Sequence, residues 1–185
     1  MKELNGNFGS ATPVLSSEHK IVLVTGHRRE SFGEGFLQIC TALKNIALRN
    51  PTVHLVYAVH LNPNVQKPVY ELLSKITNIH LIPPQDYKNF VALMNRSTLI
   101  LTDSGGIQEE APSLKKPTLV MREKTERPEG VQANLLKLVG TDPAVISHAV
   151  QELLDNETTY KNMQQAPNPY GDGTASKQIV AHLKG

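Results

Sequence analysis

The most constraining feature of this chain is a series of short runs built almost entirely from Ile, Val, Leu and Thr. A strand with one face in water alternates apolar and polar residues, whereas a strand covered on both faces does not. Strands of the second kind occur in parallel sheets whose two faces are packed with helices. The runs therefore predict a parallel sheet of six strands, over residues 20–25, 53–59, 79–82, 98–102, 118–121 and 135–139.

The stretches between these runs have the character of helices. Each is bounded by a helix signal, such as Asn50-Pro51 after the first and the acidic N-cap candidate Asp86 before the third. Beyond Gly140 no further strand is evident, so the last helices predict a C-terminal helical wrap. The architecture is a doubly wound α/β sheet, in which ligands bind beyond the carboxyl ends of the strands. The expected helices span residues 35–49, 64–75, 86–96, 142–154, 157–165 and 174–183.

Length and composition describe one globular domain of 185 residues with a net charge of +2. Residues 1–18 are rich in Gly, Ser, Asn and Pro, which predicts a linker or residual segment before a folded domain at 19–185. The charge gives no reason to expect nucleic acid or a membrane as partner. Neither a signal peptide nor a membrane span is evident, so we expect a cytoplasmic protein. Cys40 is the single cysteine and lies on an apolar helix face, which predicts a buried, inert thiol.

The loop at residues 25–35 follows the first strand and is the first candidate anion site. It combines Gly26, His27, Arg28 and Arg29 with the start of a helix, and these groups suit a phosphate. It lacks the Gly-Lys-Ser/Thr of a Walker A loop. The alternative is a surface turn whose arginines are solvated or paired with nearby glutamates.

The loop at residues 103–110 follows the fourth strand and is the second candidate. The adjacent Gly105 and Gly106 leave backbone N–H groups uncovered, and Ser104 can cap the helix that starts there. Glu109 and Glu110 point in directions about 100° apart, so one can face the ligand and accept bonds from ribose hydroxyls. The alternative is that both carboxylates only favour the first helical turn.

The loop at residues 122–130 alternates charges, for which a solvated loop is the default expectation. The histidines outside the first loop show no metal-ligand spacing, so no metal site is expected. These histidines are His19, His54, His60, His80, His148 and His182.

Four separated motifs resemble the non-hydrolysing UDP-N-acetylglucosamine 2-epimerase family. The resemblance extends over about residues 19–183 and implies the C-terminal domain of a two-domain, glycosyltransferase-B type fold with Rossmann-like halves. The motifs are Gly-His-Arg-Arg-Glu at 26–30, Asp-Ser-Gly-Gly-Ile-Gln-Glu-Glu-Ala-Pro at 103–112, Glu-Arg-Pro-Glu at 126–129 and Asn-Pro-Tyr-Gly-Asp-Gly at 168–173.

The resemblance implies a role for each matching residue in holding UDP in the cleft between the domains. It implies no cofactor, and the family is usually homodimeric. The implied contacts are Gln85 and Phe90 near the uracil, His27 with Ser104, Gly105 and Gly106 at the diphosphate, Glu110 on the ribose and Arg127 on the phosphate side.

The family reaction inverts C2 by eliminating UDP to a glycal and adding it back, which gives UDP-N-acetylmannosamine. His27, the one catalytic residue expected in this chain, and the arginines would stabilise the departing diphosphate. The carboxylates that move protons belong to the N-terminal domain. We therefore expect residues 1–185 to bind UDP weakly and to turn over nothing alone.

Two positions depart from the family pattern. Lys115 stands where glycine is common at a left-handed helix end, and Asn134 replaces another common glycine. A glycosyltransferase of the same fold is an alternative, but the two glutamates separated by seven residues that its retaining members often show are missing, since Pro117 and Thr118 follow Glu109 and Glu110 at that interval. A non-catalytic UDP-sugar sensor is a further alternative.

Overall fold

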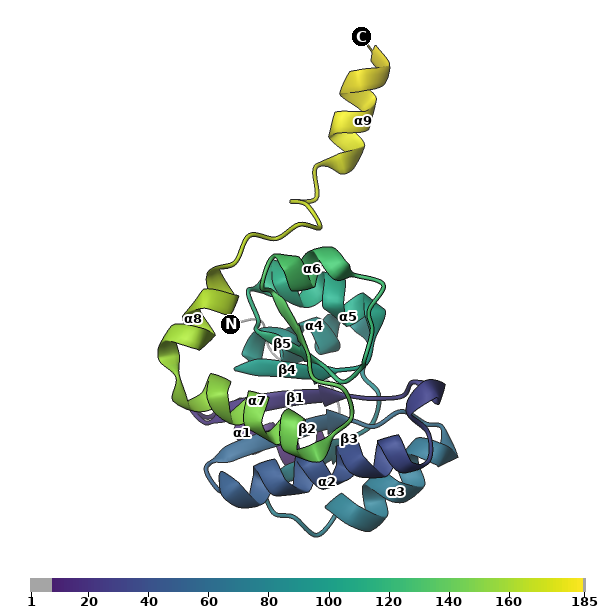
Figure 1. Ribbon diagram of the computed structural model, residues 1–185, viewed down its shortest axis with the longest axis vertical. Coiled ribbons are helices and arrows are strands. Elements are labelled where there is room, and N and C mark those ends of the chain that lie inside the picture. The colour runs from purple at the N-terminus through teal and green to yellow at the C-terminus, as the bar shows by residue number, and fades with distance from the viewer. Residues whose placement is uncertain (1–7, 185) are drawn as a thin grey trace.

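The computed structural model describes residues 8–184, and its centre is a six-stranded, fully parallel sheet (Figure 1). The spatial order is β3-β2-β1-β4-β5-β6, the order of a Rossmann-like sheet. Every strand overlaps the run expected from the sequence, so the doubly wound α/β class is confirmed. The strands are β1 (Lys20–Thr25), β2 (Val53–Ala58), β3 (Ile79–Ile82), β4 (Leu99–Thr102), β5 (Thr118–Val120) and β6 (Leu136–Leu138).

Helices cover both faces of the sheet, which explains why the strands are apolar without alternation. Val22 and Val24 of β1 belong to one hydrophobic cluster, whereas Ile21 and Leu23 belong to the cluster on the other face. The first cluster is closed by α2 (Glu34–Arg49), α3 (Pro63–Leu73), α7 (Pro143–Asp155) and Met163 of α8 (Glu157–Gln165), and the second by α4 (Tyr87–Arg96) with the 3-10 turn η3 (Ala111–Leu114).

The segment before His19 corrects the expected domain boundary. A 3-10 turn, η1 (Gly9–Ala11), and a short helix, α1 (Thr12–Leu15), follow Phe8. Their apolar side chains are buried against the same face as α4, and Arg96 donates from Nε to the carbonyl of Leu15 at 3.0 Å. Packing of the sheet's second face, rather than any periodicity, orders residues 8–15, so the folded unit begins before His19. The rest of the expected linker, residues 1–7, lies outside the described residues.

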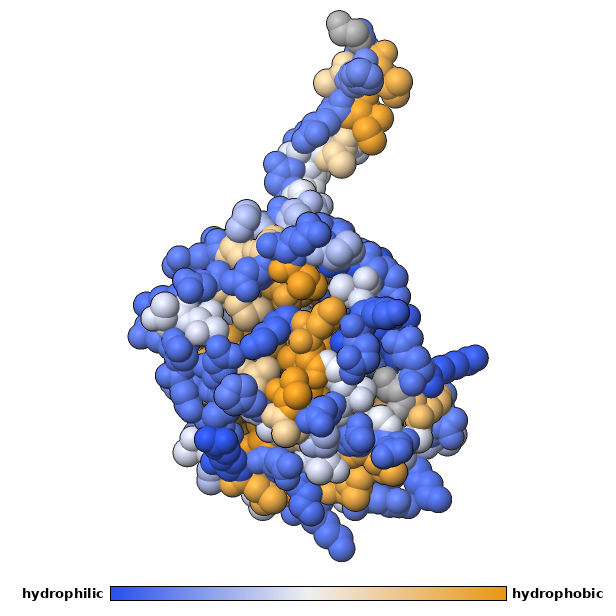
Figure 2. All heavy atoms as spheres, viewed as in Figure 1, coloured by the Kyte–Doolittle hydropathy of each residue, from blue (hydrophilic) through white to orange (hydrophobic). Residues whose placement is uncertain are grey.

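The last helix corrects the expected C-terminal wrap. Helices α7 and α8 pack on the domain, but α9 (Ala175–Lys184) has no buried residue and projects away from it (Figure 1). Its apolar side chains, among them Ile179, Val180 and Leu183, lie on one side of the helix in open view (Figure 2). The amphipathic pattern correctly predicted a helix, yet residues 8–174 provide no surface that covers it. None of the helices between residues 8 and 184 is long and apolar enough to cross a bilayer.

The strand order reverses direction between β1 and β4. The chain runs from β1 to β2 and β3 on one side, then returns to β4, β5 and β6 on the other. The loops after β1 and β4 therefore diverge and leave a crevice between them, the usual ligand position in such sheets. Thr25 and Thr102 are paired in register at these two carboxyl ends.

Candidate functional site

The floor of the crevice is a hydrogen-bonded pair of threonines. The Oγ1 atoms of Thr25 and Thr102 lie 2.6 Å apart and are buried, and Thr102 Oγ1 also accepts from the backbone N–H of Ser104 at 3.0 Å. These bonds join the end of β1 to the end of β4 and to the loop that begins α5 (Gly105–Glu110). The two loops identified from the sequence are therefore held together at their bases.

Asp103 organises the loop after β1. Its side chain is completely buried, and Oδ2 accepts from the backbone N–H groups of His27 and Arg28 at 2.7 and 2.8 Å. The hydroxyl of Tyr57 donates to the carbonyl of Gly26 at 3.0 Å. A Cβ at Gly26 would lie 3.2 Å from the hydroxyl oxygen of Tyr57. The backbone of the loop is thus fixed on both sides, with His27 at its tip.

A pocket of about 200 Å³ brings together four of the residues expected at the site: His27, Gln85, Phe90 and Ser104. They come from the loops after β1, β3 and β4 and from α4, at one edge of the sheet. The lining also includes Thr25 and Gly26 of the first candidate loop and Ile107 of the second. Ala58, His60 and Pro84 were not singled out from the sequence, although their positions at or just beyond strand ends could have indicated them.

His60 is the most informative of the lining residues that sequence analysis missed. Its ring stacks on that of His27, with centroids 5.2 Å apart and planes inclined by 14°. Sequence analysis tested His60 only for metal-ligand spacing, and its pairing with His27 depends on the β1–β2 packing.

Gly105 lies beneath two guanidinium groups. A Cβ built on Gly105 would be 3.4 Å from Nη2 of Arg28 and 3.9 Å from Nη2 of Arg127, whereas a Cβ on Gly106 would meet nothing within 4 Å. The side chain of Ser104 makes no capping bond to α5, contrary to expectation, so its hydroxyl is not committed to the helix. The loop therefore offers a small backbone surface with cationic groups above it.

The loop after β5 is an ion-pair network rather than the solvated loop expected from its alternating charges. The side chain of Arg122 is 7% exposed; its Nε donates to Glu30 at 2.6 Å and its Nη atoms donate to both oxygens of Glu126 at 2.7 and 2.8 Å. Hydrogen bonding to Arg122 lowers the pKa of Glu126 to about 2, and raises the pKa of Arg122 above its ordinary value. The bonds connect the loops after β1 and β5.

The two glutamates of α5 have different surroundings. Glu109 forms an ion pair with Nε of Arg127. Glu110 has no ion-pair partner among residues 8–184, and burial together with the charge of Glu109 raises its pKa. Glu110, Gly105, Gly106 and Arg127 lie outside the lining of the pocket, so their expected contacts with UDP stay predictions.

Gln108 was not singled out from the sequence, and it is buried between the loops. Its Nε2 donates to the carbonyl of Ser104 at 3.2 Å, while its Oε1 accepts from Thr125 Oγ1 at 2.5 Å. Thr125 Oγ1 in turn accepts the backbone N–H of Arg127 at 3.0 Å. A polar chain from Ser104 to Arg127 therefore sets the position of the third motif.

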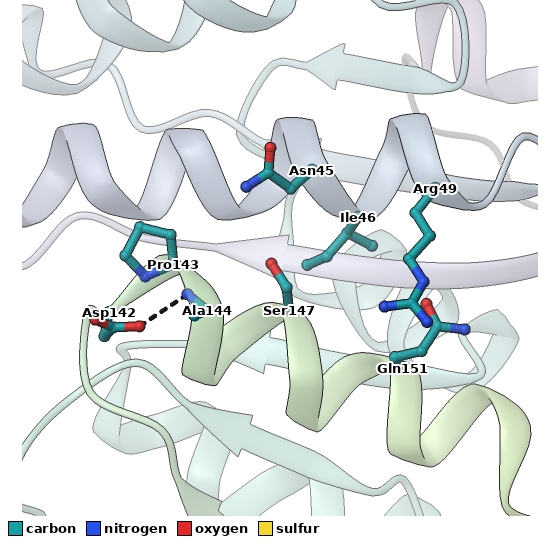
Figure 3. Close-up of a pocket in the computed structure, with 8 residues that line it drawn as sticks. All are labelled: Asn45, Ile46, Arg49, Asp142, Pro143, Ala144, Ser147 and Gln151. Atoms are coloured by element: carbon teal, nitrogen blue, oxygen red, sulfur yellow. Dashed lines mark hydrogen bonds between the residues drawn. The ribbon is translucent and has the colours of Figure 1, made fainter.

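A larger hollow of about 440 Å³ lies elsewhere, between α2 and α7 (Figure 3). None of the expected site residues lines it. Asp142 at one end is engaged as the N-cap of α7, and Gln151 at the other end bonds to Asn50 and Asp155. We regard it as a groove between packed helices, because Asp142 and Gln151 bond to the helices that form it.

Residues 8–184 contain no group of three or more His, Cys, Asp or Glu side chains arranged to hold a metal ion. Cys40 is fully buried, and burial raises the pKa of its thiol to about 12, so it is unreactive at neutral pH, as expected.

The fold and the crevice define a Rossmann-like domain of the kind found in glycosyltransferase-B type proteins. The UDP-N-acetylglucosamine 2-epimerase family model matches residues 3–184, and the chain belongs to that family. It is 59% identical over 166 residues to a UDP-N-acetylglucosamine 2-epimerase of Campylobacter jejuni, covering 90% of this chain and 43% of that protein. The enzyme of Escherichia coli K12 is 53% identical over 98% of this chain and 48% of its own length.

Solved structures give the same family. The UDP-GlcNAc 2-epimerase of Neisseria meningitidis, bound to UDP-GlcNAc, superposes with a TM-score of 0.89 at 49% identity, over 94% of this chain and 47% of that one. The Staphylococcus aureus MnaA–UDP structure gives 0.85 at 46% identity, over 90% and 46%. The chain spans about half the length of these relatives and matches their C-terminal half.

Proposed function

We propose that this chain is the UDP-binding half of a UDP-N-acetylglucosamine 2-epimerase, and that the crevice beyond β1 and β4 takes the UDP portion of the substrate. The observation that carries the proposal is the convergence of His27, Gln85, Phe90 and Ser104 on one pocket. These residues are up to 77 positions apart in sequence, yet each is a residue for which the family resemblance implies a UDP contact.

The chemistry of the lining suggests how UDP lies in the crevice. Phe90 and Gln85 offer an aromatic face and an amide to a uracil base at one side. On the other side, the guanidinium groups of Arg28 and Arg127 lie close to the backbone at Gly105, and they suit a diphosphate. Glu110 follows on α5, outside the pocket lining, and we assign it to the ribose hydroxyls because the family resemblance implies that contact.

In the full reaction this half would act on the leaving group. Elimination of UDP places negative charge on the diphosphate, and donors fixed before the reaction stabilise that charge by several kcal/mol. His27 and the arginines are such donors. The carboxylates that move the C2 proton are implied to lie in the other half, so this chain alone binds UDP without turnover.

Calorimetric titration with UDP tests the binding role. Wild-type protein should bind, and Ser104→Ala and Glu110→Ala should each weaken binding about tenfold, the expected effect of losing a hydrogen bond to a charged or polar ligand. Thr41→Ala, which removes an exposed helix hydroxyl far from the crevice, should leave affinity unchanged. Equal affinity in all four proteins refutes the assigned roles.

Restoration of the missing half tests the catalytic role. The N-terminal half of the Campylobacter jejuni relative can be fused before this chain at the equivalent junction. The fusion should convert UDP-N-acetylglucosamine to its C2 epimer and introduce deuterium at C2 in D₂O. Transfer of the sugar to an acceptor would instead indicate a glycosyltransferase, and an inactive fusion that still binds UDP would indicate a sensor.

A further inference from the structure

The carboxylate of Asp103 has one oxygen that is fully used and one that is not. Oδ2 accepts two backbone N–H groups, whereas Oδ1 is buried and has no hydrogen-bond partner among the described residues. A buried, unpaired carboxylate oxygen is costly, so it is expected to find a donor. The nearest ionisable partner is the Nδ1 atom of His27, 3.4 Å away.

The imidazole of His27 is held in a definite orientation by its surroundings. Nδ1 faces Asp103, and one face of the ring stacks on His60. The backbone carries the ring on a loop that Tyr57 and Asp103 fix from two sides. Since Nδ1 is directed to the buried carboxylate, Nε2 on the opposite side of the ring is the nitrogen left for a ligand in the crevice.

We propose that Asp103 is a positioning residue that keeps a proton on Nδ1 of His27 and thereby reserves Nε2 for the diphosphate. A carboxylate accepts hydrogen bonds and donates none, so the neutral ring must carry its single proton on the nitrogen that faces Asp103. A second proton can then enter only at Nε2, where it is presented to the ligand. The ligand part of this inference rests on the proposed function; the tautomer part does not.

The arrangement predicts how binding depends on pH. In the neutral ring Nε2 carries a lone pair, which repels a phosphate oxygen. In the imidazolium Nε2 carries a proton and donates a hydrogen bond to the phosphate oxygen. The titratable groups that face the His27 ring are the imidazole of His60 and the carboxylate of Asp103. The imidazolium form of His27 should therefore hold UDP-N-acetylglucosamine more tightly than the neutral form.

The substitution Asp103→Asn separates this role from a structural one. The amide oxygen of Asn can still accept the two backbone N–H groups, but its NH₂ would face Nδ1 as a donor. Nδ1 must then become an acceptor, and the proton of the neutral ring moves to Nε2. Asp142→Asn is the matched control, because Asp142 also accepts two backbone N–H groups, at 2.8 and 3.0 Å, away from the crevice.

The test is ¹⁵N NMR of the imidazole nitrogens of His27 at a pH where the ring is neutral, without ligand. Wild type and Asp142→Asn should both show the proton on Nδ1, and Asp103→Asn should show it on Nε2. A wild-type ring with the proton on Nε2, or an equal mixture of tautomers, overturns the inference, and this result needs no variant to fold.

A titration with UDP-N-acetylglucosamine, whose diphosphate does not ionise between about pH 6 and about pH 8.5, completes the test. Wild-type affinity should fall about tenfold over that range, and the affinity of Asp103→Asn should change little. The same flat profile in both proteins overturns the role toward the ligand. If wild type shows the expected tautomer but binds no UDP-N-acetylglucosamine, the proposed function fails while the Asp103–His27 pairing stands.

Discussion

Nδ1 of His54 lies 2.9 Å from Nε2 of His80, so two imidazoles on neighbouring strands share one hydrogen bond. His19 lies against His54, with ring centroids 4.8 Å apart, and Nδ1 of His80 is 3.2 Å from Oγ of Ser10. A bond between two imidazoles requires one nitrogen without a proton. This cluster is at the amino ends of the strands, on the opposite edge of the sheet from the crevice.

The histidine pair predicts acid sensitivity of the fold. Burial, then the charge of His19, lowers the pKa of His54, and burial, then the charge of His54, lowers the pKa of His80. Both groups therefore bind protons less readily in the folded than in the unfolded state. The free energy of unfolding should be constant above the ordinary histidine pKa of about 6.5 and should fall as the pH drops below it.

Urea unfolding at about pH 7.5 and about pH 5.5 measures this loss. His80→Gln, which keeps a polar group on β3 but cannot take up a proton, should reduce the loss, and His148→Gln on the exposed face of α7 should not. An equal loss in all three proteins would place the acid sensitivity elsewhere.

The ion pairs of Arg122 connect the loops after β1 and β5, so we expect its removal to destabilise the fold. Its removal leaves Glu30 and Glu126 without their shared cation, but both glutamates are about half exposed and regain water. We therefore expect Arg122→Met to lower the free energy of unfolding by about 1–2 kcal/mol, less than for a fully buried pair. Lys161→Met, which breaks an exposed pair with Glu157, should lower the free energy of unfolding much less in the same denaturation experiment. Similar losses in the two variants would contradict the role of Arg122.

The left-handed backbone at Lys115 predicts that a glycine at this position would stabilise the fold. It has φ 54° and ψ 44°, the left-handed conformation that the sequence indicated, and only glycine takes it up without a Cβ penalty. Lys115→Gly should raise the free energy of unfolding by about 1 kcal/mol. Asn134 has φ 60°, and because asparagine tolerates this region, Asn134→Gly should gain less. A loss of stability in Lys115→Gly would show that its side chain makes a stabilising contact.

Features with a local signal could be predicted from the sequence, whereas features that depend on contacts between loops could be predicted only in part. The strands follow from uninterrupted apolar runs, and the strain at Lys115 follows from one residue type at a helix end. In contrast, the bonds from Arg122 to Glu30 and from Asp103 to His27 join positions far apart. Charge alternation alone could not distinguish a solvated loop from such a network, and composition could not show that residues 8–15 cover the sheet.

The exposure of helix α9 predicts that the domain tolerates its deletion. No residue of Ala175–Lys184 is buried, so deletion from Ala175 onward removes no packing from the described domain. The urea midpoint and the slope of the transition should both stay unchanged, because the slope reports the surface exposed on unfolding. Deletion from Glu157 onward, which also removes the buried Met163, should lower the midpoint. A loss of stability from the shorter deletion alone would mean that α9 packs on the domain in solution.

The substitution Gly105→Ala is expected to weaken UDP binding without changing the stability of the fold. A Cβ at this position is 3.4 Å from the end of the Arg28 side chain, a flexible group that can move by a few tenths of an ångström. Gly105 is the first residue of α5, where alanine is a better helix former than glycine, so Gly105→Ala should leave the free energy of unfolding unchanged within about 0.5 kcal/mol.

The same methyl group would occupy the surface on which we place the diphosphate. UDP affinity of Gly105→Ala should therefore fall at least about tenfold in calorimetry, although the protein is folded. Gly35→Ala is the matched control, because Gly35 is also helical and its Cβ would meet only Thr141 at 3.7 Å, outside the crevice. If Gly105→Ala binds UDP as tightly as Gly35→Ala, the diphosphate does not approach the backbone at Gly105, and the arginines above it must hold the ligand at a greater distance.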